Sequence, residues 1–205
     1  MTSATTRHSA TWLTMAVLAI LVSLYAAAAL FIPQTRPAFI QNLFDLRPMA
    51  IAAHLSGGIL ALLLGAFQVS AQFRNKHIDA HRLMGKIYIA GVIVGGLGGL
   101  ALAVRSTGGL VGHVGFGMMA VLWIATAVNA LRHILQGNVM AHRAWMLRSY
   151  ALTLAAVTLR IYLPLSQVAG ISFDEAYPAI AWLCWVPNLL FVEWVILARP
   201  AATSH

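Results

Sequence analysis

Two stretches of the sequence place the same chemically versatile residues where a long apolar run begins. DAHRLMGKIY occupies residues 79–88 and MAHRAWMLRSY occupies residues 140–150, so Ala-His-Arg occurs twice. An imidazole nitrogen can bind haem iron, and a guanidinium can hold an anionic group through charge-assisted hydrogen bonds. A histidine within a membrane segment is costly and therefore indicates function by default. The candidate binding residues in these stretches are His81, Arg82, His142 and Arg143.

Both stretches belong to a longer internal repeat. HLSGGILALLLGAFQVSAQFRNKHIDAHRLMG begins at His54 and aligns with HVGFGMMAVLWIATAVNALRHILQGNVMAHRAWM, which begins at His113. Each copy starts with a histidine, continues through small residues and an arginine, and ends in Ala-His-Arg followed by a methionine. The two histidines are 27 residues apart in one copy and 29 in the other. This pattern predicts the duplication of a two-helix hairpin.

The composition predicts that these hairpins are membrane helices. Of the 205 residues, 60% are hydrophobic and 9% are charged, and a helix needs about twenty mostly apolar residues to cross a bilayer. Six apolar runs have that length: 11–32, 49–71, 83–104, 109–131, 144–164 and 177–198. We expect an all-α transmembrane protein, a six-helix bundle that forms one membrane domain over residues 1–205. Its central four-helix core, residues 49–165, consists of the two parallel repeats, and helices 11–32 and 177–198 flank it.

The net charge of +8 indicates membrane topology rather than nucleic-acid binding. If the helices alternate in direction, one membrane face collects nine of the thirteen basic residues: Arg7, Arg74, Lys76, Arg82, Lys86, Arg132, Arg143, Arg148 and Arg199. The positive-inside rule places this face in the cytoplasm. We therefore expect a multi-pass protein of the bacterial cytoplasmic membrane with both termini cytoplasmic. The first run is longer than the core of a signal peptide, so we expect it to remain as a helix.

Symmetry between the repeats predicts how the histidines meet. Parallel repeats pack about an axis along the membrane normal, so equivalent residues face one another. We expect His54 to face His113 near the extracytoplasmic side, and His81 to face His142 near the cytoplasmic side. Each pair can supply both axial ligands of a haem b, which gives one or two haems. Taken singly, each histidine also fits an interfacial anchor or a hydrogen-bonded packing residue.

The surroundings of the histidines suit a porphyrin. Glycines follow His54 and His113 by about one turn, and they would let the backbone stand back from a flat ring. Arg82 and Arg143 could pair with propionates or with an anionic substrate. His113 and Arg132 are nineteen residues apart, or about 28 Å of helix. The two histidine levels would then be about 20–25 Å apart, which spans most of the hydrocarbon.

One histidine on each of four core helices resembles the cytochrome b561 superfamily of two-haem membrane proteins. In that superfamily the first and third core helices bind one haem and the second and fourth bind the other. The resemblance covers residues 54–165 and implies that His54, His81, His113 and His142 are the ligands. This sequence departs from the superfamily pattern in its shorter joints and in the position of His81 and His142 close to the helix starts. The pattern HLSGG–FQ–R–HR–GK-Y followed by HR-WM-RSYALTLAAVTLR-YLP is similar to a bacterial family of predicted membrane proteins, DUF2306, which implies no activity.

The sequence favours a membrane cytochrome that passes electrons across the bilayer from quinol or a small reductant. The alternative is a haem-free bundle that either lines a path for a solute or proton or is purely structural. Under that alternative Arg82, Arg143 and Arg148 would matter more than the histidines. No phosphate-binding loop, dinucleotide fingerprint or hydrolase motif occurs in the sequence.

The last apolar run carries three local signals. Ser172 and Glu175 form a predicted capping box at its start. Pro187 lacks a backbone donor and is expected to kink the helix. Glu193 is an acid inside the run and could either pair with an arginine or accept protons from a quinol.

Overall fold

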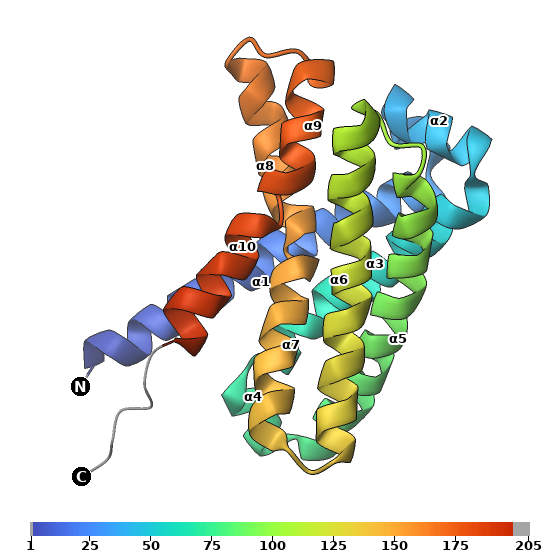
Figure 1. Cartoon of the computed structure of the whole chain (residues 1–205). Helices are drawn as coiled ribbons and strands as arrows, with labels where there is room; N and C mark the ends of the chain where they lie inside the picture. The colour runs from blue at the N-terminus through green and yellow to red at the C-terminus, as the bar shows by residue number, and fades with distance from the viewer. Residues whose placement is uncertain (1, 199–205) are drawn as a thin grey trace. The chain divides into compact units, whose positions relative to one another are not determined.

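The computed structural model describes residues 2–198, and over that range the chain contains helices and no strand (Figure 1). Arg199, which the charge pattern counted, lies outside the described residues. The chain forms two compact units, Met1–Gly98 and Gly99–His205, which divide near the end of α5. The prediction that the whole chain is a single membrane domain stays a prediction.

Unit 1 contains the first five α-helices, most of α5 included. They are α1 (Thr2–Phe31), α2 (Ala38–Leu46), α3 (Pro48–Gln68), α4 (Ala71–Lys76) and α5 (Ile78–Ala103), with the short 3₁₀ helix η1 (Pro33–Thr35) after α1. Unit 2 contains α6 (Gly109–Leu135), α7 (Val139–Thr153), α8 (Ala155–Val168), α9 (Phe173–Leu183), α10 (Val186–Phe191) and the π-helix η2 (Val192–Leu197).

Six helical segments are long and apolar enough to cross a membrane, which confirms the predicted number of spans within the described residues. Their bounds are Thr11–Phe31, Pro48–Gln68, Ile78–Ala103, Gly109–Leu135, Val139–Val168 and Phe173–Val195. The third and fifth spans begin about five residues before the predicted apolar runs. The reason is that the residues of Ala-His-Arg are helical and form the first turn, whereas hydropathy marks only where the apolar residues begin.

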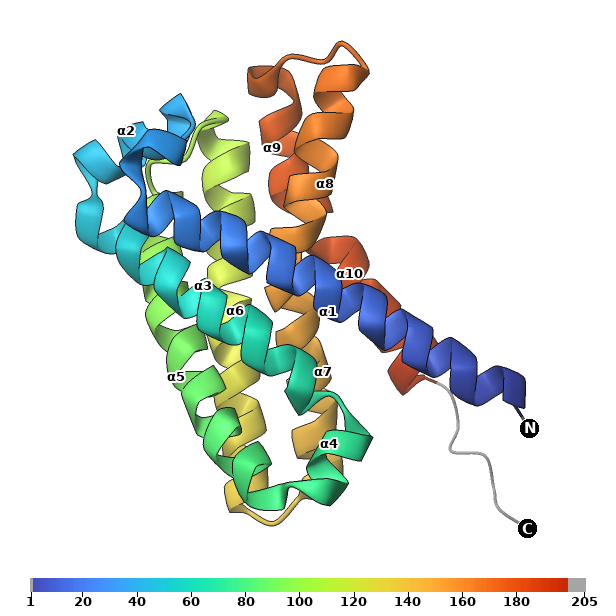
Figure 2. The ribbon, with the colours of Figure 1, turned by 180° about the vertical axis from the view of Figure 1, so that it is seen from behind.

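Helix packing in unit 1 depends on glycine. α1 runs beside α3 (Figure 2), and Trp12 Nε1 donates to the Ala66 carbonyl at 2.8 Å. α3 also contacts α5. There a Cβ at Gly57 would overlap the Gly91 carbonyl oxygen and would lie 2.7 Å from Gly95 Cα. α3 and α5 therefore approach backbone to backbone, as small residues allow in membrane helices.

In unit 2, α6 and α7 form an antiparallel hairpin (Figure 1). Trp123 is 5% exposed, and its Nε1 donates to Thr153 Oγ1 at 2.8 Å across the hairpin. α9 packs against α6, where Gly115 makes room for Trp182. Polar side chains thus find partners within the hairpin, as they must in a medium without water.

The last two spans are both interrupted. α7 and α8 divide at Leu154, and α9 ends before Cys184 and Trp185, after which α10 begins with Pro187 in its first turn. The break at Pro187 confirms the predicted kink, since proline cannot continue the hydrogen-bond ladder. Both halves of the capping box between Ser172 and Glu175 are present, as the sequence predicted.

The two hairpins of the repeat differ in their turns. α3 ends fourteen residues after His54, and the separate helix α4 follows, whereas α6 continues for twenty-two residues after His113. The repeated arginine consequently lies in different settings, with Arg74 in α4 and Arg132 in the last turn of α6. Ser70 accepts a hydrogen bond from Phe73 N and starts the extra helix, a local cap that has no counterpart in the second copy.

Candidate functional site

His54 links the two glycine-packed helices of unit 1. It lies two turns into α3, is half-buried, and its Nδ1 is 2.9 Å from the Gly95 carbonyl of α5. A carbonyl only accepts, so Nδ1 carries the proton and the ring lone pair is on Nε2. This is the tautomer that a metal-binding histidine adopts when a backbone carbonyl orients it.

His81 and Arg82 occupy the first turn of α5. His81 is half-buried, and its backbone carbonyl accepts from Gln68 Nε2 at 3.2 Å, which ties the start of α5 to the end of α3. The Arg82 side chain is 70% exposed and lies 3.6 Å from Asp79. The helix start therefore directs the arginine outward.

His113 hydrogen-bonds through its other nitrogen. It lies in the first turns of α6, and its Nε2 is 2.9 Å from the Ser106 carbonyl in the turn before that helix. Nε2 consequently carries the proton and Nδ1 the lone pair. The bond supports a turn in which Gly108 adopts a φ of +97°, a conformation that favours glycine.

His142 joins the two helices of the α6–α7 hairpin near their turn. Its Nδ1 is 2.9 Å from the Ala130 carbonyl, so the lone pair is on Nε2, as in His54. Asn138 caps α7 by accepting from Ala141 N at 3.0 Å, which fixes the turn of helix that carries the histidine. Arg143, the next residue, is exposed.

Each unit keeps its two histidines at opposite ends of a span. In unit 1 the ring of His54 contacts α5 at Gly95, fourteen residues beyond His81, which is about 21 Å of helix. In unit 2 the ring of His142 contacts α6 at Ala130, seventeen residues beyond His113, which is about 26 Å. The pairing of His54 with His113 and of His81 with His142 stays a prediction.

Two of the glycines near the histidines make close helix contacts, and the expected space for a porphyrin stays a prediction. Gly57 faces Gly91 and Gly95, and a Cβ at Gly115 would lie 2.8 Å from Trp182 Nε1. Gly58 differs, because a Cβ there would have nothing within 4 Å. Among residues 2–198, no three His, Cys, Asp or Glu side chains gather in a way that could hold a bare metal ion.

Comparison with known proteins gives a family. Residues 51–196 match the family described as Predicted membrane protein (DUF2306). The chain belongs to this family. The DUF2306 match includes all four candidate histidines. No curated protein and no solved structure matches the chain, so the similarity to cytochrome b561 receives no support from these comparisons.

The same DUF2306 region contains an ion pair inside the membrane spans. Arg148 of α7 holds Glu193 with two hydrogen bonds, Nε to Oε1 at 2.5 Å and Nη2 to Oε2 at 2.8 Å. Trp145 lies against the guanidinium, 4.7 Å from the ring centroid to Cζ. The pair confirms that Glu193 has an arginine partner. The sequence analysis counted Arg148 on the cation-rich face but did not identify it as the partner of Glu193, since the two residues are 45 positions apart.

A second polar cluster was not predicted. Asn188 Nδ2 lies 2.9 Å from Thr158 Oγ1, 3.1 Å from the Cys184 carbonyl and 3.3 Å from the Ala151 carbonyl. It therefore connects the interrupted fifth span to the interrupted sixth. The signal in the sequence was an asparagine directly after Pro187, where a broken helix leaves carbonyls to be satisfied.

Proposed function

We propose that this DUF2306 protein is a b-type cytochrome that passes electrons across the membrane from quinol or a small reductant. The observation that supports it is the separation of the histidines within each unit, about 21 Å along α5 and about 26 Å along α6. One histidine near each end of a span in both units is the arrangement that two haems, one in each leaflet, require.

The ring tautomers support two of the four ligands directly. His54 and His142 each donate Nδ1–H to a backbone carbonyl, so Nε2 carries the ring lone pair with which a histidine binds iron. His113 has the opposite arrangement and would have to release the Ser106 carbonyl before it binds iron through Nε2. His113 therefore costs more to recruit than His54 or His142.

In this proposal His54 and His113 hold one haem b, and His81 and His142 hold the other. Haem supplies reversible one-electron chemistry when it is bound. Arg82 and Arg143 are exposed at the helix starts, where a guanidinium can hold a propionate by charge-assisted hydrogen bonds. The carbonyl hydrogen bonds of His54 and His142 hold the two rings in place.

Optical spectra test the proposal. The full-length protein is produced with a supply of haem, and reduced-minus-oxidised spectra are recorded for the wild type, His54→Asn and His142→Asn. We expect a b-type signal in the wild type and a reduced signal in each variant. Arg47→Gln, which changes no proposed ligand, is the control and should keep the signal. A colourless wild-type protein would exclude the proposal.

A second function is favoured by a specific observation, namely that three of the four histidines hydrogen-bond a backbone carbonyl. In a haem-free bundle these rings would simply connect helices and turns. Asparagine can keep a donor near the Nδ1 position of His54, whereas alanine cannot. If stability is lost in His54→Ala and restored in His54→Asn, and neither the wild type nor the variants bind haem, the histidine is a structural link.

A further inference from the structure

The extra helix α4 adds cations to one end of unit 1, and among the cations at that end the proposed electron transfer uses only Arg82. We define the elbow as residues 67–86, from the end of α3 through α4 to the third turn of α5. It carries one carboxylate, Asp79, and four cations: Arg74, Lys76, Arg82 and Lys86. Lys76, Arg82 and Lys86 are exposed, and Arg74 is half-buried. Arg82 and Lys86 are four residues apart and so share one face of α5.

The cations of the elbow are available to a ligand. Among the side chains that the structure describes, those of Arg74, Lys76 and Lys86 make no hydrogen bond or ion pair with one another or with a neighbour, and Arg82 has one long contact of 3.6 Å to Asp79. The opposite end of unit 1 differs. There Arg36 is already engaged by the Ala29 carbonyl at 2.7 Å and by the Phe44 ring at 3.6 Å.

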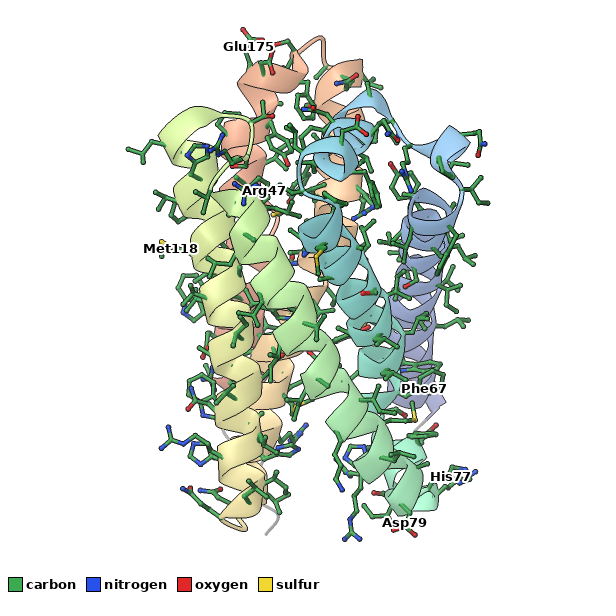
Figure 3. The ribbon with its side chains drawn as sticks, turned by 90° about the vertical axis from the view of Figure 1, so that its right-hand side faces the viewer. Arg47, Phe67, His77, Asp79, Met118 and Glu175 are labelled. Atoms are coloured by element: carbon green, nitrogen blue, oxygen red, sulfur yellow. The ribbon has the colours of Figure 1, made fainter. Side chains whose placement is uncertain are left out.

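Aromatic rings mark the depth of the elbow in the bilayer. Trp12 contacts Phe67 at 6.3 Å between centroids, Phe67 contacts Phe73 at 5.5 Å, and Phe73 contacts His77 at 5.5 Å. Figure 3 places Phe67, His77 and Asp79 in succession toward one end of unit 1, with Arg47 toward the other. Tryptophan concentrates at the membrane–water interface, so Trp12 marks that level and we expect the cations beyond it at the level of lipid phosphates.

The elbow is held in this shape by the helices themselves. Gln68 Nε2 donates to the His81 carbonyl, and a Cβ at Gly85 would lie 3.2 Å from Gln68 Oε1. The end of α3 is thereby fixed to the first turns of α5, and α4 is held between them. The cations are consequently presented together rather than on a loose loop.

We propose that the elbow binds the headgroup of an anionic phospholipid. Four cations against one carboxylate favour a headgroup with net negative charge over a zwitterionic one, because juxtamembrane lysine and arginine are attracted to anionic leaflets. The ring series places acyl chains beside Phe67 and phosphate beside Lys76 and Lys86. Lys76 and Lys86, which test this inference, have no role in the proposed haem binding.

Native mass spectrometry of the full-length protein in detergent tests the site. Phosphatidylglycerol and phosphatidylcholine with identical acyl chains are titrated against the wild type and Lys76→Gln/Lys86→Gln. We expect the wild type to prefer phosphatidylglycerol, and the double variant to bind it about tenfold or more weakly. Binding of phosphatidylcholine should not change. Both lysines are exposed, so the variant should keep its helix content by circular dichroism.

Two matched variants test whether the charge itself, and its position at the elbow, are what the lipid requires. Lys76→Arg/Lys86→Arg keeps both charges and should bind phosphatidylglycerol like the wild type. Arg47→Gln removes one charge at the other end of unit 1 and should also leave binding unchanged. Unaltered binding in Lys76→Gln/Lys86→Gln, or an equal loss in Arg47→Gln, would overturn the site. Displacement of the lipid by inorganic phosphate at the same free concentration would overturn its assignment to a phospholipid.

Discussion

At the scale of single residues, two polar side chains of the last span have partners on the fifth span. Glu193 is held by Arg148, and Asn188 connects Thr158 with carbonyls of two interrupted helices. A membrane interior offers no water to replace such partners, so removing one leaves the other exposed to a large desolvation penalty. The histidines follow the same rule, because three of them engage backbone carbonyls.

Because Arg148 and Glu193 form an ion pair, mutations of the two residues should have non-additive effects on the free energy of unfolding. Glu193→Gln leaves the Arg148 charge without its carboxylate, and we expect a loss of about 1–2 kcal/mol in the free energy of unfolding. This loss is smaller than that of a fully buried pair, since the side chains of Arg148 and Glu193 remain 22% and 35% exposed. Arg148→Met/Glu193→Met should recover most of the loss. Denaturant titrations of the four proteins of the cycle measure the coupling, and strictly additive effects would contradict it.

Asn188 makes a second prediction at this scale. Asn188→Leu removes the donor that reaches Thr158, Cys184 and Ala151, and we expect it to cost about 1–3 kcal/mol in unfolding free energy. Thr158→Val removes a single link of the cluster and should cost less, about 0.5–1.5 kcal/mol. Denaturant titration measures the unfolding free energy of both variants and shows which loses more. Equal stability of Asn188→Leu and the wild type would show that the cluster contributes nothing.

At the scale of helices, glycine sets the closest contact. Gly57 of α3 meets Gly91 and Gly95 of α5 backbone to backbone, and His54 donates to a carbonyl on the same side of the crossing. The position of the histidine ring therefore depends on the glycine contact. In unit 2 a helix interruption sets a contact instead. Pro187 lacks a backbone donor, so the helix is interrupted before it, and Asn188 donates a hydrogen bond to the Cys184 carbonyl.

Adjacent glycines give a matched test of the crossing. Gly57→Ala would force a methyl group into the backbone of α5, and we expect a destabilisation of about 3 kcal/mol. Gly58→Ala meets nothing within 4 Å and should be neutral or stabilising by up to about 1 kcal/mol through helix propensity. Thermal unfolding in detergent compares the two. A tolerated Gly57→Ala would show that the helices are not in contact there.

At the scale of the whole molecule, the six spans lead to a prediction of topology. If they alternate in direction, we expect the α4 elbow and the turn after α6 on the face with most cations, and the turn between α8 and α9 on the other. The lone cysteine, Cys184, is fully buried. Introduced cysteines can therefore report on topology against a silent background.

Labelling from outside the cell tests the predicted orientation. Asp174→Cys should react with a membrane-impermeant maleimide in intact cells, whereas Lys76→Cys should react only after permeabilisation. Both positions are exposed. The wild type serves as the control, because its single buried thiol should not react. Labelling of both variants in intact cells would contradict the three membrane crossings that separate the two positions, since an odd number places them on opposite sides.

The sequence by itself determined the helical class, the six spans, the interruption at Pro187 and the need of Glu193 for a partner. These follow from hydropathy, a missing backbone donor and the cost of a charge in lipid, which are properties of a short stretch of chain. Tertiary structure decided which ring nitrogen three of the histidines use, that Gly57 and Gly115 serve helix contacts, and that Arg148 is the partner of Glu193. It also revealed α4, which interrupts the repeat. The physical reason is rotational. A helix that is apolar on every side does not encode in its sequence which face meets which neighbour, so those contacts are fixed by packing.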